Sequence, residues 1–424
     1  MSEIIHVQFG QGGNNIGTYF YQNISEEDEI LQINTNPDQN PKNQTNLSKY
    51  YEKTVKNEYF PRSILVDLDP AGLNLPLNSP ILKNSIHITG KIGAGNNWAK
   101  GHYTDGAEIM DDLLELTRKK VENCEFLQGF QICMSMGGGT GSGMGSSFVY
   151  NIKQEYPSKF LNAFTTFPSF KVPNAVVEPY NVLLGLNVLL DCCDCIIAID
   201  NDKILEICVN ELGIQEPLFS DLNYLIGMAM SNLSSCNRFK GTDCLDFEKL
   251  AINLTPFPKL KILTVGLSPI LYKNCNRISS LSLSSIIHEI YSSKNMFCFF
   301  DSVKSRHLAS AGIFIGRVSS QDLENFFSMM KLTQSSLEWI PDNNKNFVYE
   351  GSHKHAMMTG TLLTNTTAIQ EPLQRFHTKF KLLHSKNAFL QYYLCEGMDG
   401  YEFIEADLNV SQTIQLYQQA ENII

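Results

Sequence analysis

Short apolar runs alternate with amphipathic segments through the first 200 residues of the chain. Segments with helical spacing, such as residues 106–123, separate the runs. This alternation predicts an α/β fold, with a doubly wound, mainly parallel sheet over residues 1–203 that binds ligands at the carboxyl ends of its strands. Five runs have the continuous apolar, β-forming composition of strands buried on both faces: IIHVQF (4–9), SILVDLD (63–69), GFQICMSM (129–136), NAFTTF (162–167) and CIIAI (195–199).

A different pattern follows in the later part of the chain. Residues 204–237 have the composition of one or two long helices, and residues 250–370 mix strand-like runs with helical segments. From Ala368 the spacing is helical almost to the last residue. We therefore expect a core helix and an intermediate, second α/β domain over residues 204–368, followed by C-terminal helices over residues 369–424.

Composition and charge argue against several classes of protein. The 424 residues carry a formal net charge of −11, whereas proteins that bind nucleic acid are usually basic, so we expect no nucleic-acid partner. The chain has no run of 18 apolar residues and no basic, apolar leader, so we expect neither a membrane span nor secretion. Eleven cysteines without a leader then indicate reduced thiols and a cytoplasmic location.

Residues 135–147, SMGGGTGSGMGSS, hold five glycines in the seven positions from Gly137 to Gly143. They lie between a predicted strand and a predicted helix, where glycines let the backbone approach a ligand and the start of the helix favours an anion. Similar turns occur at 10–17 (GQGGNNIG) and 93–101 (GAGNNWAKG). One such turn is usually only a turn. Three of them at one edge of a sheet predict a phosphate site.

The common phosphate-binding motifs are absent from this sequence. It contains neither G-x-x-x-x-G-K-[ST] nor G-x-G-x-x-G, so backbone amides, polar side chains and a metal ion must hold the phosphates. The segment VDLDP (66–70) places Asp67 and Asp69 at the end of a predicted strand. Carboxylates beside phosphates are typical Mg²⁺ ligands, directly or through water.

The glycine-rich run also carries a family resemblance. GGGTGSG (137–143) is the signature of the tubulin family, and the first glycine loop resembles tubulin's GQCGNQIG. The likeness continues through PRSILVDLDP, GAGNNWAKGHYTDGAE, VVEPYN, KLAINLTPFPKL, EWIPDN, TTAIQE and EGMDGYEF, and covers about residues 3–420. KVPNAVVEPYN and EGMDGYEF resemble beta-tubulin rather than alpha-tubulin. The resemblance implies a divergent beta-like tubulin, a GTP-binding protein of the microtubule cytoskeleton that assembles head to tail.

The resemblance also implies which residues hold GTP or GDP with Mg²⁺. Asp69 stands where the family has a glutamate near the metal. Asn201 and Asn223 would bond the guanine edge, and Phe219 would stack on the base where beta-tubulin has a tyrosine. Glu178 would meet the ribose. The remaining contacts, to the phosphates and the ribose region, would come from Gly10, Gln11, Gly12, Asn15, Asn96, Ser135, Gly138, Gly139, Thr140, Gly141 and Asn174.

Tubulin-like polymers complete their GTPase site between subunits, where an acidic residue of the next subunit positions the attacking water. The equivalent residue here is Lys249, as in beta-tubulin. A protonated lysine cannot orient water as a carboxylate does, and the adjacent Glu248 would point about 100° away on a helix. We therefore expect no catalytic residue in the chain for its own GTP, which an alpha-type tubulin partner would hydrolyse slowly in the polymer. The alternative is that Asp246 and Glu248 are only solvated helix charges.

Two departures from the family concern polymer contacts. The segment LYKNCNRISS (271–280) keeps the length of the lateral-contact loop but few of its residues. No glutamate-rich tail follows YQQAENII, which predicts weaker recruitment of motors and associated proteins to the C-terminal helices. One alternative function is thus a non-polymerising or accessory GTP switch, for example at a centriole or basal body. Another is a nicotinamide or flavin oxidoreductase, which the missing G-x-G-x-x-G motif and the guanine-side asparagines disfavour.

Overall fold

The computed structural model covers most of the chain. Residues 273–280 of the predicted lateral-contact loop (271–280) and the segment EWIPDN (338–343) lie outside the described residues. The described residues are 2–30, 34, 46–54, 58–239, 241, 246–272, 281–299, 305–316, 318, 319, 321, 323, 344–351 and 356–422.

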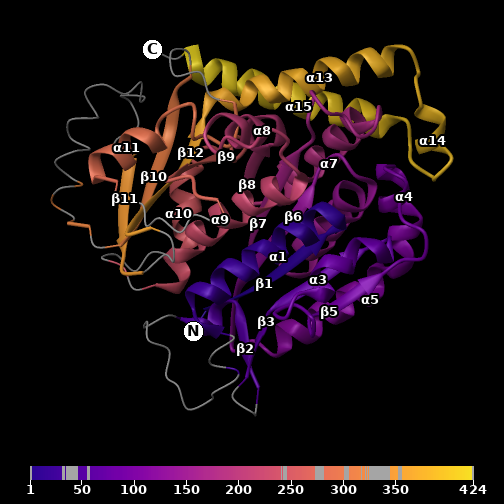
Figure 1. Ribbon diagram of the computed structural model, residues 1–424. Coiled ribbons are helices and arrows are strands. Elements are labelled where there is room, and N and C mark those ends of the chain that lie inside the picture. The colour runs from indigo at the N-terminus through magenta and orange to yellow at the C-terminus, as the bar shows by residue number, and fades with distance from the viewer. Residues whose placement is uncertain are drawn as a thin grey trace.

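One ten-stranded sheet runs through the molecule (Figure 1). Neighbouring strands are parallel except that β12 runs antiparallel to β10 and to β9, which confirms the predicted α/β class with a mainly parallel sheet. A hairpin of β2 (Tyr51–Lys53) and β3 (Tyr59–Pro61) forms a second, small sheet. In spatial order, the large sheet contains β11 (Asn344–Tyr349), β10 (His307–Gly316), β12 (Met358–Thr366), β9 (Ile262–Ser268), β8 (Cys195–Asp200), β7 (Phe160–Phe167), β6 (Phe126–Ser135), β1 (Ser2–Phe9), β4 (Ser63–Asp67) and β5 (Ile86–Thr89).

Both faces of the sheet are buried, because successive residues of its strands enter different apolar clusters. In β8, Ile196 packs on one face and Ile197 on the other. The first cluster includes residues of α5 (Asp105–Glu122), α6 (Gly145–Glu155), α7 (Glu178–Cys192), α13 (Gln370–Ser385) and α15 (Tyr401–Asn422). The second includes residues of α1 (Gly10–Glu27), α8 (Asn201–Asn210), α9 (Phe219–Arg238) and α10 (Phe247–Leu254).

Shorter helices complete the described fold, and α11 packs against strands of the second half of the chain. Helices α13 and α15 lie side by side at the top of the view in Figure 1. The remaining elements are η1 (Leu47–Lys49), η2 (Pro70–Leu73), α3 (Asn74–Asn78), α4 (Trp98–Tyr103), the π-helix η3 (Gly139–Met144), α11 (Leu283–Ile290), η4 (Thr367–Ile369) and α14 (Leu390–Leu394). Among the described residues, no helix combines the length and apolar character that crossing a membrane requires.

The order of the strands creates a crevice beside β1. The chain first adds β4 and β5 on one side of β1 and then adds β6, β7 and β8 on the other. At such a reversal the loops that follow the strands diverge, and their carboxyl ends leave room for a ligand. The later strands extend the same sheet, because β9 pairs in parallel with β8 through Ile196 and Ile197. The helical segment predicted at 204–237 divides into α8 and α9, and α8 begins earlier, at Asn201.

Candidate functional site

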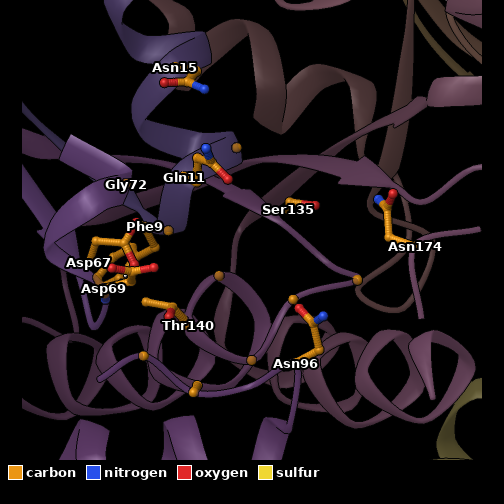
Figure 2. A pocket seen from close by; sticks show the side chains of 18 of the residues that line it. Phe9, Gln11, Asn15, Asp67, Asp69, Gly72, Asn96, Ser135, Thr140 and Asn174 are labelled. Carbon is orange, nitrogen blue, oxygen red and sulfur yellow. Dashed lines mark hydrogen bonds between the residues drawn. The ribbon is translucent and has the colours of Figure 1, made fainter. Parts of the chain in front are cut away.

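A cavity of about 550 Å³ lies at the carboxyl ends of β1, β4 and β6. Every residue that the sequence assigned to nucleotide or metal binding lines it. In Figure 2, Gln11 and Asn15 come from α1, whereas Asn96 and Thr140 lie on the opposite side with Ser135 between the two groups. The structure therefore brings together residues that are distant in the sequence, as the sharing of one sheet edge predicted.

The sequence did not single out several residues that also line the cavity. Thr166 and Pro168 stand at the end of β7, the strand next to β6, so attention to every strand end would have found them. Ile16 and Ala94 belong to the glycine-rich turns at 10–17 and 93–101, and Phe9 ends the strand before the first of them, so their segments were predicted although these residues were not. These additional residues include Phe9, Ile16, Ala71, Gly72, Ile92, Ala94, Thr166 and Pro168.

The glycines around the cavity have two different structural tasks. Gly10 has a φ of +69°, and a Cβ atom there would lie 3.1 Å from the backbone nitrogen of Gly141. A Cβ atom on Gly141 would in turn lie 2.5 Å from the carbonyl oxygen of Ser135. Those glycines let two loops pack backbone against backbone. Gly138 differs, because a Cβ atom there would meet nothing within 4 Å, so its backbone borders open space in the cavity.

Two helical segments begin at the cavity without a side-chain cap. In the described chain, no side chain caps the start of α1 or of η3, and neither has an acidic residue in its first turn. Gly10, Gln11 and Gly12 of α1 line the cavity. The first N–H groups of a helix need acceptors, and its positive dipole end favours negative charge. A bound anion would satisfy both requirements.

Two carboxylates stand at the β4 side of the cavity. One oxygen of Asp69 accepts a hydrogen bond from the backbone of Ala71 (2.9 Å), and Oδ1 of Asp67 accepts one from the backbone of Asp69 (3.1 Å). Oδ2 of Asp67 is buried and has no hydrogen-bond partner among the described residues. Burial, followed by the negative charge of Asp69, raises the pKa of Asp67 to about 6. This oxygen packs against Gly72, where a Cβ atom would lie 1.9 Å from it, while the Asp67 side chain borders the cavity beside Asp69.

Replacing Asp67 by asparagine should stabilise the protein in metal-free, nucleotide-free buffer above pH 6. Because the folded-state pKa is raised to about 6, wild-type stability should fall as pH rises through about 4 to 6, when the buried carboxyl loses its proton. The asparagine variant has no carboxyl group to ionise, so its stability should not fall over this pH range. Its free energy of unfolding at pH 7 should be about 1–3 kcal/mol higher than that of the wild type. Urea denaturation at pH 4 and pH 7 measures the difference. A variant that is less stable than wild type at pH 7 would contradict the assignment of a buried charge.

The far side of the cavity presents an aromatic ring and two amides. Phe219 begins α9 with 54% of its surface exposed, and Asn223 lies one turn later on the same side of that helix. Asn201 is the first residue of α8, whose start is capped when Asp200 accepts a hydrogen bond from the backbone of Asp202 (2.9 Å). An accessible ring beside paired amides suits a planar heterocycle with a hydrogen-bonding edge.

Asn174, in the loop before α7, and Glu178, the first residue of that helix, line the same cavity. The Glu178 carboxylate accepts a hydrogen bond from the backbone of Asn174 (3.2 Å). Burial raises the pKa of Glu178 above its usual range. The carboxylate is therefore held in place by its own loop and keeps acceptor capacity for a hydroxyl donor.

The predicted catalytic-loop residues lie at the other edge of the sheet. The residues Phe247 and Glu248 of α10 pack beside the amino ends of β1, β6 and β7. Glu248 turns inward and accepts a hydrogen bond from Gln128 (3.4 Å), whereas Lys249 is exposed. Asp246 pairs with Lys49 (3.2 Å). Neither acidic residue is simply a solvated charge, and neither occupies the outward position of Lys249.

Comparison with known proteins agrees with this geometry. Residues 3–209 match the family model described as Tubulin/FtsZ family, GTPase domain, and residues 258–378 match that of the tubulin C-terminal domain. The chain is 39% identical over 432 aligned positions to a protein named tubulin beta chain from Cicer arietinum, an alignment that covers all of this chain and 96% of the other. The cavity is thus that of a GTPase domain whose family binds GTP and GDP. The chain belongs to the tubulin family and is similar to beta-tubulin over its whole length.

Proposed function

We propose that this chain is a GTP-binding subunit of a microtubule-type polymer, in which it takes the beta position and pairs with an alpha-type tubulin. The observation that carries the proposal is the placement of two features at opposite edges of one sheet. The nucleotide cavity opens at the carboxyl ends of the strands, and Lys249 is exposed beside their amino ends. Contacts between unlike surfaces of successive subunits generate an open filament. Such assembly would place the protein in the cytoskeleton.

Exposed apolar side chains at both edges support head-to-tail contact. Val176 and Leu218, which flank cavity-lining residues, are 65% and 67% exposed. At the α10 edge, Ile252 is 59% exposed. Apolar surface at two opposite ends favours burial against a neighbouring subunit. A partner that covers the cavity mouth would also close the nucleotide site.

The nucleotide would lie with its phosphates between α1 and η3 and its base at the far side of the cavity. The starts of α1 and η3 would supply backbone donors to the phosphates. Phe219 would stack on the guanine, and Asn201 and Asn223 would bond its edge. Glu178 would accept a hydrogen bond from the ribose.

A magnesium ion would fit beside the phosphates. Among the described residues, no three or more histidine, cysteine or acidic side chains gather to form a complete metal site. Mg²⁺ is commonly held by one or two carboxylates together with water and phosphate oxygens, and the two aspartates provide that donor set. Asp67 and Asp69 would hold the ion directly or through water, and the ion would neutralise phosphate charge. Asp69 is the ligand that the family resemblance implies, and Asp67 is the second carboxylate that the strand end VDLDP offers.

Hydrolysis would depend on the partner. We infer that an acidic residue of an alpha-type subunit, docked over the cavity, orients the attacking water. The equivalent outward position of this chain holds Lys249, which supplies no carboxylate to the next nucleotide. The chain would therefore turn GTP over slowly alone and faster within the polymer.

Co-assembly with alpha-tubulin tests the proposed function. The chain, alpha-tubulin and GTP are mixed, pelleted and imaged by electron microscopy. We expect filaments with the longitudinal repeat of tubulin, and pelleting of the chain only when alpha-tubulin is present. Nucleotide binding by a chain that stays soluble and monomeric in every mixture would instead support the accessory GTP switch. Failure to bind GTP would reject both functions.

A further inference from the structure

A fully buried asparagine joins the two loops on one side of the cavity. Asn181 lies in the first turn of α7 with no exposed surface. Its Nδ2 donates to the carbonyl oxygens of Asn96 (2.7 Å) and Gly137 (2.8 Å). Its Oδ1 accepts from the backbone N–H of Trp98 (3.1 Å) and from the hydroxyl of Tyr393 (2.8 Å). Carbonyls only accept and an amide N–H only donates, so these partners fix the orientation of the side chain.

Both carbonyls that Asn181 holds belong to segments that form the cavity wall. Asn96 lines the cavity and has a φ of 56°, a left-handed conformation that few residues other than glycine adopt readily. Gly137 directly precedes Gly138, the glycine whose backbone borders open space. The Ser142 hydroxyl also donates to the Asn181 carbonyl (2.7 Å). The asparagine therefore fixes one loop after β5 and another after β6 relative to each other.

The same side chain connects these loops to the C-terminal helices. Tyr393 lies in α14 and is buried, and its hydroxyl joins this segment to the Asn181 side chain. A second bond to this segment runs from Nδ2 of Asn97 to the carbonyl of Tyr392 (2.8 Å). A third, from the Tyr180 hydroxyl to the carbonyl of Ala388 (3.0 Å), does not involve Asn181.

We propose that Asn181 is a positioning residue for the phosphates of the nucleotide and that the Tyr393 hydroxyl is one of the partners that hold its amide in the required orientation. The inference rests on the proposed nucleotide site and adds to it a group that does not touch the ligand. Asn181 acts through the Asn96 and Gly137 backbones, so its loss should impair binding of phosphate-bearing ligands more than binding of the nucleoside. Tyr393 makes α14 part of the support for the cavity wall.

Tyr393→Phe tests the inference with Tyr180→Phe as its matched control. Each variant loses one hydroxyl hydrogen bond between the segment around α14 and the rest of the chain, but only the first loss removes a partner of the Asn181 side chain. We expect Tyr393→Phe to weaken GTP binding about three- to tenfold, in line with the loss of one hydrogen bond, and to leave guanosine binding unchanged. Tyr180→Phe should bind both ligands as wild type does. Titration calorimetry of the purified chain with GTP, GDP and guanosine measures the affinities.

A double-mutant cycle adds a second measurement. In an Asn181→Ala background, the Tyr393→Phe change should have no further effect on GTP affinity, because the two groups act through one bond. Equal weakening of GTP and guanosine binding, or equal effects of the two tyrosine variants, would overturn the positioning role. So would full additivity in the cycle. A wild-type chain that binds neither GTP nor GDP would instead reject the proposed function.

Discussion

Replacing Gly138 by valine is expected to reduce GTP affinity by about 100-fold while the fold stays intact. The glycine lines the cavity, and a Cβ atom there would project into space that holds no protein atom within 4 Å. Its φ of −91° and ψ of 162° lie in the extended region that valine adopts readily. The added methyl groups would thus occupy ligand volume, at a cost of up to about 3 kcal/mol in affinity. Nucleotide titration gives the affinity, and thermal denaturation without nucleotide gives the stability.

Two further glycines provide the controls for this prediction. Gly400→Val adds the same side chain where a Cβ atom would only just reach Leu394, at 4.0 Å, so GTP affinity should not change. Gly141→Ala should lower stability itself, because its Cβ atom would lie 2.5 Å from the Ser135 carbonyl. Wild-type GTP affinity in a folded Gly138→Val variant would show that the phosphates do not approach this loop.

A Lys249→Glu variant should gain the ability to activate the nucleotide of the neighbouring subunit. The side chain at this position is exposed on α10, at the opposite edge of the sheet from the chain's own cavity. A carboxylate there would orient the attacking water in the nucleotide site of the neighbouring subunit. A general base of this kind raises the rate of hydrolysis by a factor of about 100 or more. In filaments formed with alpha-tubulin, we expect both nucleotides of each pair to be hydrolysed instead of one. Chromatography of nucleotide extracted from pelleted filaments measures this.

Lys249→Gln separates the gain of a carboxylate from the loss of a positive charge. It should leave hydrolysis at the wild-type level, and Glu248→Gln should do the same because Glu248 faces Gln128 rather than the surface. Faster hydrolysis with glutamine at 249 would contradict a general-base effect. Loss of hydrolysis in Glu248→Gln would mean that the inward-turned residue, not the outward position, serves the neighbour.

Local sequence signals predicted the cavity well where the constraint itself is local. A glycine-rich turn after an apolar strand needs only neighbouring residues to be recognised, and parallel strands necessarily present their carboxyl ends at one edge. For that reason the sequence, together with its family resemblance, assigns residues as widely separated as Gln11 and Asn223 to one site. Thr166 carries only the weaker signal of a strand end, and its place at the site depends on β7 lying next to β6.

Other features depend on contacts between distant segments, and the sequence gives no sign of them. The four bonds of the Asn181 side chain include partners 85 residues away at Asn96 and 212 residues away at Tyr393. The burial of one Asp67 oxygen becomes evident only when the packing around it, including Gly72, is known. Likewise, β8 pairs with β9 and thereby joins the two parts of the sheet. The apolar composition of a strand does not specify which other strand it pairs with.

The sequence by itself determined the fold class and the family, and it predicted most residues of the cavity and the lysine expected at the catalytic-loop position. These features follow from sequence patterns and motifs, because local backbone conformation and side-chain chemistry restrict which residues can occupy each position. Only the tertiary structure decided that Lys249 faces outward at the opposite sheet edge, that one oxygen of Asp67 is buried against Gly72, and that Asn181 ties the cavity wall to α14. Burial and hydrogen-bond partners arise when remote segments pack together, so they are properties of the folded chain.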